Sequence, residues 1–153
     1  MQTPTNHSYD ALVIGGGPAG SATASIVAEY GHRVLVLERE RFPRYHIGES
    51  LIPLTFQPLH RLGLVPAMKQ SKFIKKYSVQ FVSPNGKASQ PFYFFTRYDR
   101  DTVAQTWQVY RSEFDQMLLN HARSRGAEVR EQTTVKELLR DDTGRVSGVR
   151  AET

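Results

Sequence analysis

The first forty residues alternate between short apolar runs and polar stretches. Residues 11–14 (Ala-Leu-Val-Ile) and 34–37 (Val-Leu-Val-Leu) are continuous apolar runs of strand length, which predict two buried strands. Between them, small and apolar residues such as Ala22 and Ile26 predict a helix that can pack closely on a sheet. Gly31 lies where that helix should end. The order strand, helix, strand predicts a βαβ unit and therefore an α/β fold.

The middle of the chain has the pattern of an antiparallel hairpin. Residues 77–82 alternate in polarity and residues 91–95 are largely aromatic, which predicts two strands. The sequence Ser-Pro-Asn-Gly at 83–86 is a strong turn signal between them. A polar loop is expected over 96–102, and a further strand over 107–110.

Two further helices are predicted. Apolar residues at irregular spacing in 54–64, with a proline among them, predict a short, imperfect helix that ends at Gly63. Ser112 can serve as the N-cap of a longer helix, with Asp115 three residues on as a variant of the capping box. The apolar face of that helix is expected to be Phe114, Met117, Leu118, His121 and Ala122. After Gly126 the predicted strands are 127–130, 135–139 and 146–151, the last two joined by a turn cluster at 141–144.

The composition limits the classes of protein. The chain has 153 residues, 39% apolar and 23% charged, and no apolar run near the roughly 18 residues of a membrane helix. Residues 1–8, a predicted disordered tail, are polar and lack the pattern of a signal peptide, so a cytoplasmic location is expected. The absence of cysteine excludes disulfides and thiolate metal sites, and the histidines have no metal-ligand spacing, so no metal is expected. The net charge of +5 is scattered apart from a lysine cluster at 69–76. This cluster predicts a solvated face, with attraction of anionic cofactors as the alternative, and not a nucleic-acid site.

A glycine motif follows the first predicted strand directly. Gly15, Gly17 and Gly20 form a Gly-x-Gly-x-x-Gly pattern, which supplies a tight turn, backbone access for a diphosphate and close packing of helix on strand. The N–H groups at the helix start, together with the helix dipole, can bind phosphate. Glu38 ends the second strand 18 residues after Gly20, about where a carboxylate can bind a ribose. We therefore predict a dinucleotide site; the alternative is an accidental glycine-rich turn in a βαβ unit.

A loop with two prolines and a glycine follows at 39–53. It leaves the carboxyl end of the second strand, and so it should lie beside the bound nucleotide. Arg44 is then either a partner of the phosphates or an ordinary surface arginine. Glu49 and Ser50 either cap a helix or make a polar contact to the cofactor. His46 fits a structural hydrogen-bonding role better than a catalytic one.

Two stretches of the chain resemble the flavin-dependent monooxygenase superfamily, and within it the flavin-dependent halogenase-like branch. Residues 11–38 are similar to the FAD fingerprint, with Gly-Gly-Gly-Pro-Ala-Gly and the final acid. Residues 42–53 (Phe-Pro-Arg-Tyr-His-Ile-Gly-Glu-Ser-Leu-Ile-Pro) resemble the strap of the halogenases, which runs between the flavin and the substrate site. Arg111 leads an Arg-x-x-Phe-Asp sequence similar to the helix start that touches FAD in this superfamily, and by the same likeness Val135 would approach the adenine through its backbone.

The resemblance implies FAD as the cofactor. The residues that it assigns to FAD are Gly15, Gly17, Pro18, Ala19, Gly20, Glu38, Arg39, Arg44, Ser50, Arg111 and Val135. It also implies reduced FAD supplied by a separate flavin reductase, molecular oxygen, and a small aromatic substrate of the phenol, pyrrole or indole type, free or carrier-bound. In such enzymes a lysine beside the substrate polarises or carries the oxidant. Lys76 has the matching position, although Ser78 stands where the family has glycine, so Lys76 is either this catalytic lysine or a surface lysine.

The fold that the resemblance implies is a Rossmann-like FAD-binding βαβ domain of the glutathione-reductase type, incomplete, with the aromatic hairpin inserted. Residues 1–153 would be the N-terminal part of that domain, and 72–108 the start of a substrate-side sheet. The Trp-x-Trp-x-Ile-Pro motif of the halogenases does not occur in the chain, so the chain alone is expected to be inactive. The alternatives are a flavin monooxygenase or geranylgeranyl-reductase-like enzyme without halide chemistry, an NAD-dependent dehydrogenase, and a truncated, non-catalytic nucleotide-binding module.

Overall fold

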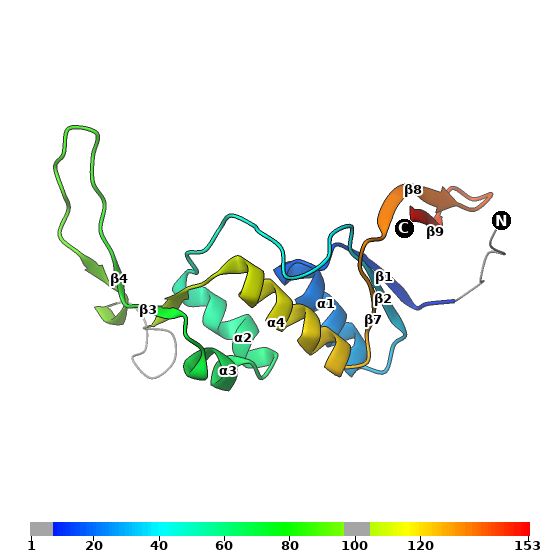
Figure 1. Ribbon diagram of the computed structural model, residues 1–153, viewed down its shortest axis with the longest axis horizontal. Coiled ribbons are helices and arrows are strands. Elements are labelled where there is room, and N and C mark those ends of the chain that lie inside the picture. The colour runs from blue at the N-terminus through cyan, green and yellow to red at the C-terminus, as the bar shows by residue number, and fades with distance from the viewer. Residues whose placement is uncertain (1–7, 97–104) are drawn as a thin grey trace. The chain divides into compact units, whose positions relative to one another are not determined.

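The computed structural model describes residues 8–96 and 105–153. The predicted disordered tail therefore lies, except for Ser8, outside the described residues, and so does most of the predicted loop over 96–102. The chain divides into two compact units, the first made of residues 1–45 with 112–153 and the second of residues 46–111 (Figure 1).

The first unit is built on a three-stranded parallel sheet in the order β1-β2-β7. Its elements in chain order are β1 (Ala11–Ile14), α1 (Pro18–Glu29), β2 (Val34–Leu37), α4 (Arg111–Ser124) and β7 (Glu128–Arg130). Parallel neighbours need crossover connections, and here helix α1 joins β1 to β2. The predicted βαβ unit is confirmed, with both strand ranges as expected.

Both helices of this unit pack on one face of the sheet (Figure 1). Val34 and Val36, which point to the same face of β2, lie in one core cluster with Ala24 of α1 and with Leu119 and Ala122 of α4. Full burial of an aliphatic side chain such as Leu119 stabilises the fold by about 1.5–3 kcal/mol. The prediction of a buried strand is thus confirmed for β2, whose four residues are all buried, but it is wrong for β1, where half-buried and exposed residues alternate because β1 lies at the edge of the sheet.

The buried face of α1 differs from the prediction. Ser21 and Ser25 are buried beside Ala24, whereas Ala22 and Ile26 are only half-buried. The two hydroxyls are satisfied by the backbone, because Ser21 donates to Gly16 O at 2.8 Å and Ser25 to Ser21 O at 2.7 Å. Small side chains with satisfied hydroxyls let the helix approach the sheet closely, so the face is set by size more than by polarity.

The helix α4 begins two residues earlier than an N-cap at Ser112 predicts. Since α4 starts at Arg111, Ser112 lies inside the helix and is not its N-cap. Asp115 is fully buried and pairs with Arg44, so the predicted capping box is wrong. The buried residues of α4 are Phe114, Asp115, Leu118, Leu119 and Ala122, which rotates the core face away from the predicted Met117 and His121. Gly126 ends the segment with a φ of 99°, as its type predicts.

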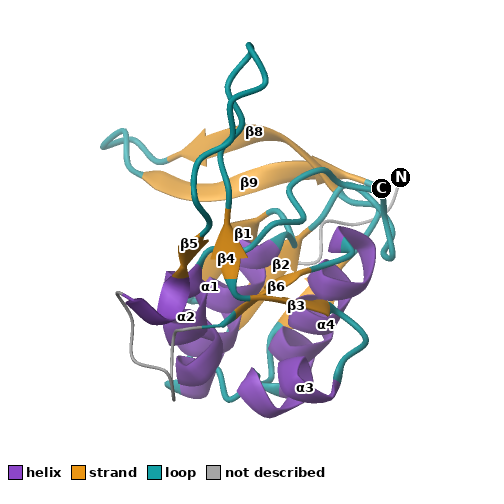
Figure 2. Ribbon diagram, turned by 90° about the vertical axis from the view of Figure 1, so that its left-hand side faces the viewer, coloured by secondary structure: helices purple, strands orange, loops and turns teal. Residues whose placement is uncertain are grey.

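The last part of the first unit is an antiparallel hairpin of β8 (Thr134–Arg140) and β9 (Val146–Glu152) (Figure 2). Asp141 organises its turn, because one carboxylate oxygen accepts the N–H groups of Thr143 and Arg145. The hydroxyl of Thr143, which donates to the same oxygen at 2.6 Å, lowers the pKa of the Asp141 carboxyl most, and the two N–H groups lower it further. The predicted strand pair and its turn cluster are confirmed.

The second unit contains short helices and two two-stranded pairings, β3 with β6 and β4 with β5. Its elements are η1 (Pro53–Thr55), α2 (Phe56–Arg61), α3 (Val65–Gln70), β3 (Ile74–Lys76), β4 (Ser78–Val79), β5 (Phe92–Tyr93), η2 (Phe94–Thr96) and β6 (Thr106–Gln108). The helix predicted over 54–64 is split into a 3₁₀ turn and α2, with Gly63 beyond its end at a φ of 71°. Helix α3 and strand β3 were not predicted, since each is too short to show a period.

Where the aromatic hairpin was predicted, strands β4 and β5 pair, but each is much shorter than predicted. Strand β4 pairs with β5 in antiparallel register, Ser78 opposite Tyr93. Beyond β4 only an isolated bridge joins Val82 to Ala88, and Phe81 is 70% exposed. An alternating sequence without a surface to cover its apolar face forms little strand, which explains the short β4. Strand β6 pairs instead with β3, also antiparallel (Figure 2).

Candidate functional site

The glycine bend between β1 and α1 leaves the start of the helix uncapped. Gly15 has a φ of 100° and its N–H donates to Leu37 O at 2.8 Å, which turns the chain away from the sheet. Gly17 is the N-cap, with no side chain to bond the helix, and Pro18 occupies the first turn. The first N–H groups of a helix have no partner within it, and they carry the positive end of its dipole. The bend therefore offers N–H donors to an anion.

Gly17 and Gly20 serve different purposes in this bend. A Cβ built on Gly20 would lie 1.9 Å from the carbonyl oxygen of Gly15, so this position must be glycine for the helix to pack on the bend. A Cβ on Gly17 would meet only the Nη2 atom of Arg44, at 3.5 Å. The backbone of Gly17 is extended, with a φ of −68°, which any residue adopts. Among the described residues, Gly17 therefore leaves room above the bend, with the guanidinium of Arg44 beside it.

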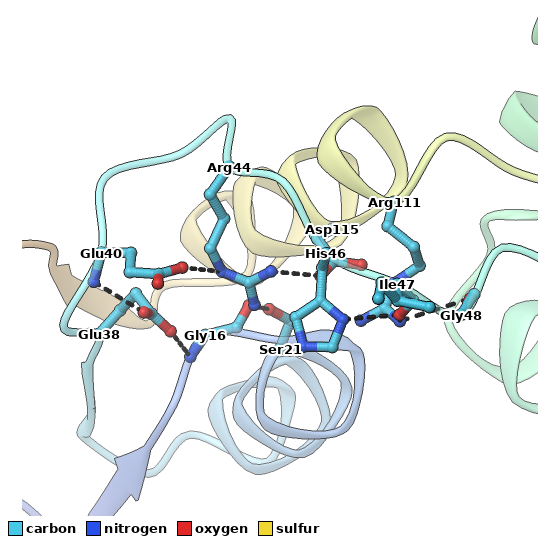
Figure 3. A network of polar contacts seen from close by, with 10 residues as sticks. All are labelled: Gly16, Ser21, Glu38, Glu40, Arg44, His46, Ile47, Gly48, Arg111 and Asp115. Atoms are coloured by element: carbon cyan, nitrogen blue, oxygen red, sulfur yellow. Dashed lines mark hydrogen bonds and ion pairs between the residues drawn. The ribbon is translucent and has the colours of Figure 1, made fainter.

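Glu38 closes the bend from the end of β2. Its carboxylate is buried and accepts the N–H of Gly16 at 2.6 Å and that of Glu40 at 2.8 Å (Figure 3). Its backbone N–H donates to Arg130 O at 2.9 Å, and its carbonyl accepts the N–H of Thr133 at 2.8 Å. A carboxylate has about four acceptor positions, so two remain for hydroxyl groups of a ligand.

Arg44 lies beside the bend and is held by two acids. Its Nε atom is 3.0 Å from Glu40 Oε2, and its Nη1 atom is 3.2 Å from Asp115 Oδ2 (Figure 3). The guanidinium also stands 4.5 Å over the ring of Phe42. Its side chain is only 11% exposed, and the buried Nη1 atom has an ion pair but no hydrogen bond of good geometry among the described residues. A buried guanidinium with donor capacity to spare, next to Gly17, suits a phosphate oxygen.

Two other predicted FAD residues belong to the same unit. Arg39 follows Glu38 and is exposed. Val135 is half-buried in β8, opposite Ala151. Val135 lies two residues after Thr133, whose N–H donates to Glu38 O. Arg39 follows Glu38 directly, so both predicted residues lie near the end of β2.

The three remaining predicted site residues belong to the second unit. Lys76 donates from Nζ to the hydroxyl of Ser50 and, at 3.0 Å, to the carbonyl of Leu51. Burial lowers the pKa of the Lys76 ammonium. Arg111 donates from Nη1 to Ile47 O at 2.7 Å (Figure 3). The structure therefore brings Lys76 and Ser50 together, a contact that the sequence did not indicate.

Sequence reasoning missed the residues that hold Arg44. Asp115 was read as a cap, and neither Glu40 nor Phe42 was assigned a contact. One signal was present: Asp115 stands between Phe114 and Leu118 on the apolar face of a helix, and a buried carboxylate requires a partner. No spacing rule names that partner, because Arg44 lies on a distant loop.

Comparison with known proteins identifies the family. The family model described as "FAD binding domain" matches residues 8–153. The chain is 39% identical over 138 residues to a flavin-dependent halogenase of Armillaria mellea, a match that covers 90% of this chain and 26% of the relative. It is 35% identical over 140 residues to a chlorinase of Pseudomonas fluorescens that acts on 1H-pyrrole-2-carbonyl on a peptidyl-carrier protein, with 82% of this chain and 31% of the relative covered.

A solved structure gives the same result. The myxobacterial chondrochloren halogenase, an FAD-dependent enzyme, superposes with a TM-score of 0.85 at 43% identity, over 94% of this chain and 32% of that chain. The chain thus spans about a quarter to a third of the length of the relatives that it matches. Among the described residues, no helix is both long and apolar enough to cross a membrane. The chain belongs to the FAD-binding domain family, with FAD as its cofactor, and it is the FAD-binding domain of a flavin-dependent halogenase-like protein.

Proposed function

We propose that the chain binds FAD at the glycine bend and serves an enzyme that halogenates an electron-rich aromatic substrate. The observation that carries the first part is the room above Gly17, bordered by the buried guanidinium of Arg44. The second part is supported by the relatives, which are flavin-dependent halogenases. Reduced FAD would activate molecular oxygen, and the residues of this chain would bind and orient the FAD.

The residues of the first unit have distinct tasks in this proposal. The N–H groups of Gly17, Ala19 and Gly20, together with Arg44, bind the diphosphate. Gly15 and Pro18 form the turn that presents these N–H groups. Glu38 accepts hydrogen bonds from the ribose hydroxyls. Arg39 and the backbone of Val135 border the adenosine part.

The residues of the second unit are proposed for the substrate side. Residues 72–108 begin a substrate-side sheet, with the aromatic hairpin as an insertion into a domain of the glutathione-reductase type. Lys76 is the proposed catalytic lysine, Arg111 and Ser50 the proposed contacts to FAD. In favour of Lys76 is its half-buried ammonium with a lowered pKa, which is uncommon for a surface lysine.

The partners follow from the relatives. The chlorinase of Pseudomonas fluorescens acts on a pyrrole that a carrier protein holds, so a phenol, pyrrole or indole, free or carrier-bound, is the proposed substrate class. A separate flavin reductase would supply reduced FAD. The absence of cysteine is compatible with the reducing cytoplasm, where reduced flavin would be available.

The test is a titration of the chain with FAD, FMN and NAD, followed by flavin fluorescence and, for NAD, by calorimetry. FAD should bind and lose fluorescence. FMN should bind much more weakly, because it lacks the adenosine and the diphosphate. Binding of NAD in preference to FAD would instead identify a dehydrogenase. For the longer protein, product formation that requires halide separates a halogenase from a flavin monooxygenase.

A further inference from the structure

The segment Glu49–Ile52, here called the strap segment, is a third strand-like element beside the β3–β6 pair. Ser50 forms an antiparallel bridge with Gln108 of β6. On its other side, Gln108 pairs with Ile74 of β3. Strand β6 therefore lies in the middle, with β3 along one edge and the strap segment along the other.

Backbone hydrogen bonds hold the strap segment to β6 on both sides of Ser50. Leu51 donates its N–H to Trp107 O at 3.1 Å, and Glu49 accepts the N–H of Val109 at 2.8 Å. An edge segment held by these two backbone hydrogen bonds would be only marginally stable without additional contacts.

Side chains from β6 and β3 supply those contacts. Thr106, which is buried in β6, donates from its hydroxyl to Ile52 O at 3.2 Å. Lys76 of β3 reaches across β6 and donates to Leu51 O at 3.0 Å and to the hydroxyl of Ser50. Two successive carbonyls of the strap segment are thus bound by side chains of the sheet, one of them charged.

Lys76 differs in this respect from its neighbour in the same strand. Lys75 is exposed, and its ammonium has no hydrogen bond to a described residue. Lys76 is half-buried and stands 5.9 Å from the ring centroid of the buried Phe94. Partial burial disfavours an ammonium, so its two acceptors in the strap segment offset that cost.

We propose that Lys76 is a positioning residue, whose ammonium fixes the strap segment to the sheet with Ser50 as its acceptor. The clamp uses two of the three N–H groups of Lys76, and the third has no acceptor among the described residues. Lys76 can therefore hold the strap segment and still present one donor to a reactant. We call the two hydrogen bonds from Lys76 to Ser50 and Leu51 the clamp, and they are contacts within this chain. The inference rests on the proposed function only for the role of the strap, which is to separate the flavin from the substrate.

The test is amide hydrogen exchange of the chain, read by NMR at Leu51 and Val109. Loss of a charge-assisted hydrogen bond in Lys76→Met should accelerate exchange at Leu51 about tenfold or more. Lys76→Arg should restore protection, because a guanidinium can donate to the same two oxygens. The matched control is Lys75→Met, which removes a charge from the same strand without touching the strap segment, and should leave exchange at Leu51 unchanged.

A second variant keeps the inference testable if Lys76→Met does not fold. Ser50 is exposed, so Ser50→Ala should fold, and it should accelerate exchange at Leu51 less than Lys76→Met does. If Lys76→Met folds and Leu51 exchanges at the wild-type rate, the clamp is overturned. If Lys76→Met does not fold, a wild-type exchange rate of Leu51 in Ser50→Ala overturns it. Equal acceleration in Lys75→Met and Lys76→Met would overturn it as well.

The clamp and the proposed function fail separately. FAD titration of the same variants reports on the function: if the wild-type chain does not bind FAD, the proposed function is wrong whatever the exchange rates are. If FAD binds and Ser50→Ala binds it as well as wild type does, Ser50 serves Lys76 and not the cofactor. If exchange is unchanged while FAD binds, only the clamp is wrong.

Discussion

The guanidinium of Arg44 lies 3.2 Å from the carboxylate of Asp115, which has no solvent exposure at all. This pair joins the loop after β2 to helix α4, two segments about seventy residues apart in the sequence. It also fixes the guanidinium beside Gly17, where we propose that the diphosphate of FAD binds. In the proposed site, the pair would therefore serve both stability and binding.

Asp115→Ala should destabilise the chain strongly. Removing one partner of a buried ion pair leaves the other charge buried and uncompensated, at a cost of about 3–5 kcal/mol. Urea unfolding followed by circular dichroism measures this. The matched control is Asp10→Ala, which breaks the exposed pair with Arg33 and should change the urea midpoint very little. Similar midpoints for the two variants would show that the Arg44–Asp115 pair does not stabilise the fold.

Gly17→Val and Gly20→Ala should fail in different ways. The Gly17→Val variant should be destabilised by no more than about 1 kcal/mol, the scale of an N-cap change. Its side chain would fill the proposed space of the diphosphate, so the variant should not bind FAD. The alanine would place its Cβ 1.9 Å from Gly15 O, and it should destabilise the fold by about 1–3 kcal/mol. FAD fluorescence quenching and urea unfolding of both variants are the measurements. A Gly17→Val chain that still quenches FAD would remove the bend from the site.

Glu38→Ala should weaken FAD binding by about 1.5–3 kcal/mol, the range for hydrogen bonds to a charged group. Glu38→Gln keeps an oxygen that can accept the N–H of Gly16, so it serves as a control in which the conformation of the glycine bend is preserved. Dissociation constants from fluorescence titration decide the matter. If both variants bind FAD as wild type does, Glu38 has no part in binding.

His121 should make the stability of the chain depend on pH. Burial is the main cause that lowers the pKa of His121 below its ordinary value of 6.5, and the positive charge of Arg125 lowers it further. The negative charge of Glu29 acts in the opposite direction. The unfolded chain then binds the proton more tightly, so the free energy of unfolding should rise with pH through the range just below 6.5. His121→Asn should remove this part of the pH dependence in urea titrations between pH 5 and pH 7. A slope that is unchanged in the variant would exclude His121 as its source.

Much of the first unit could be predicted because local rules and tertiary structure agree there. The runs at 11–14 and 34–37 are apolar, bounded by glycine or charge, and both became strands at the expected residues. Gly31 and Gly126 end helices with positive φ, as glycine permits. The hairpin of β8 and β9 is equally local, since its turn is organised by the side chain of Asp141.

The contacts that bring distant segments together could not be predicted. The partner of Arg44 lies on α4, and the acceptors of Lys76 lie on the strap segment, and no spacing along the chain encodes either pair. The hairpin strands were predicted too long for a related reason. Alternation of polarity shows that a strand is possible, but only a covering surface makes it form, and Phe81 remains 70% exposed.

If Glu38 binds the ribose as proposed, its hydrogen bond to Gly16 limits how the cofactor site can be redesigned. In many nucleotide sites an acid at the end of the second strand can be exchanged to accept a phosphorylated ribose. Here the same carboxylate also ties down the N–H of Gly16, so exchanging it would loosen the loop on which the diphosphate is to rest. A change of cofactor preference would therefore require a second substitution that supplies a new acceptor for that amide.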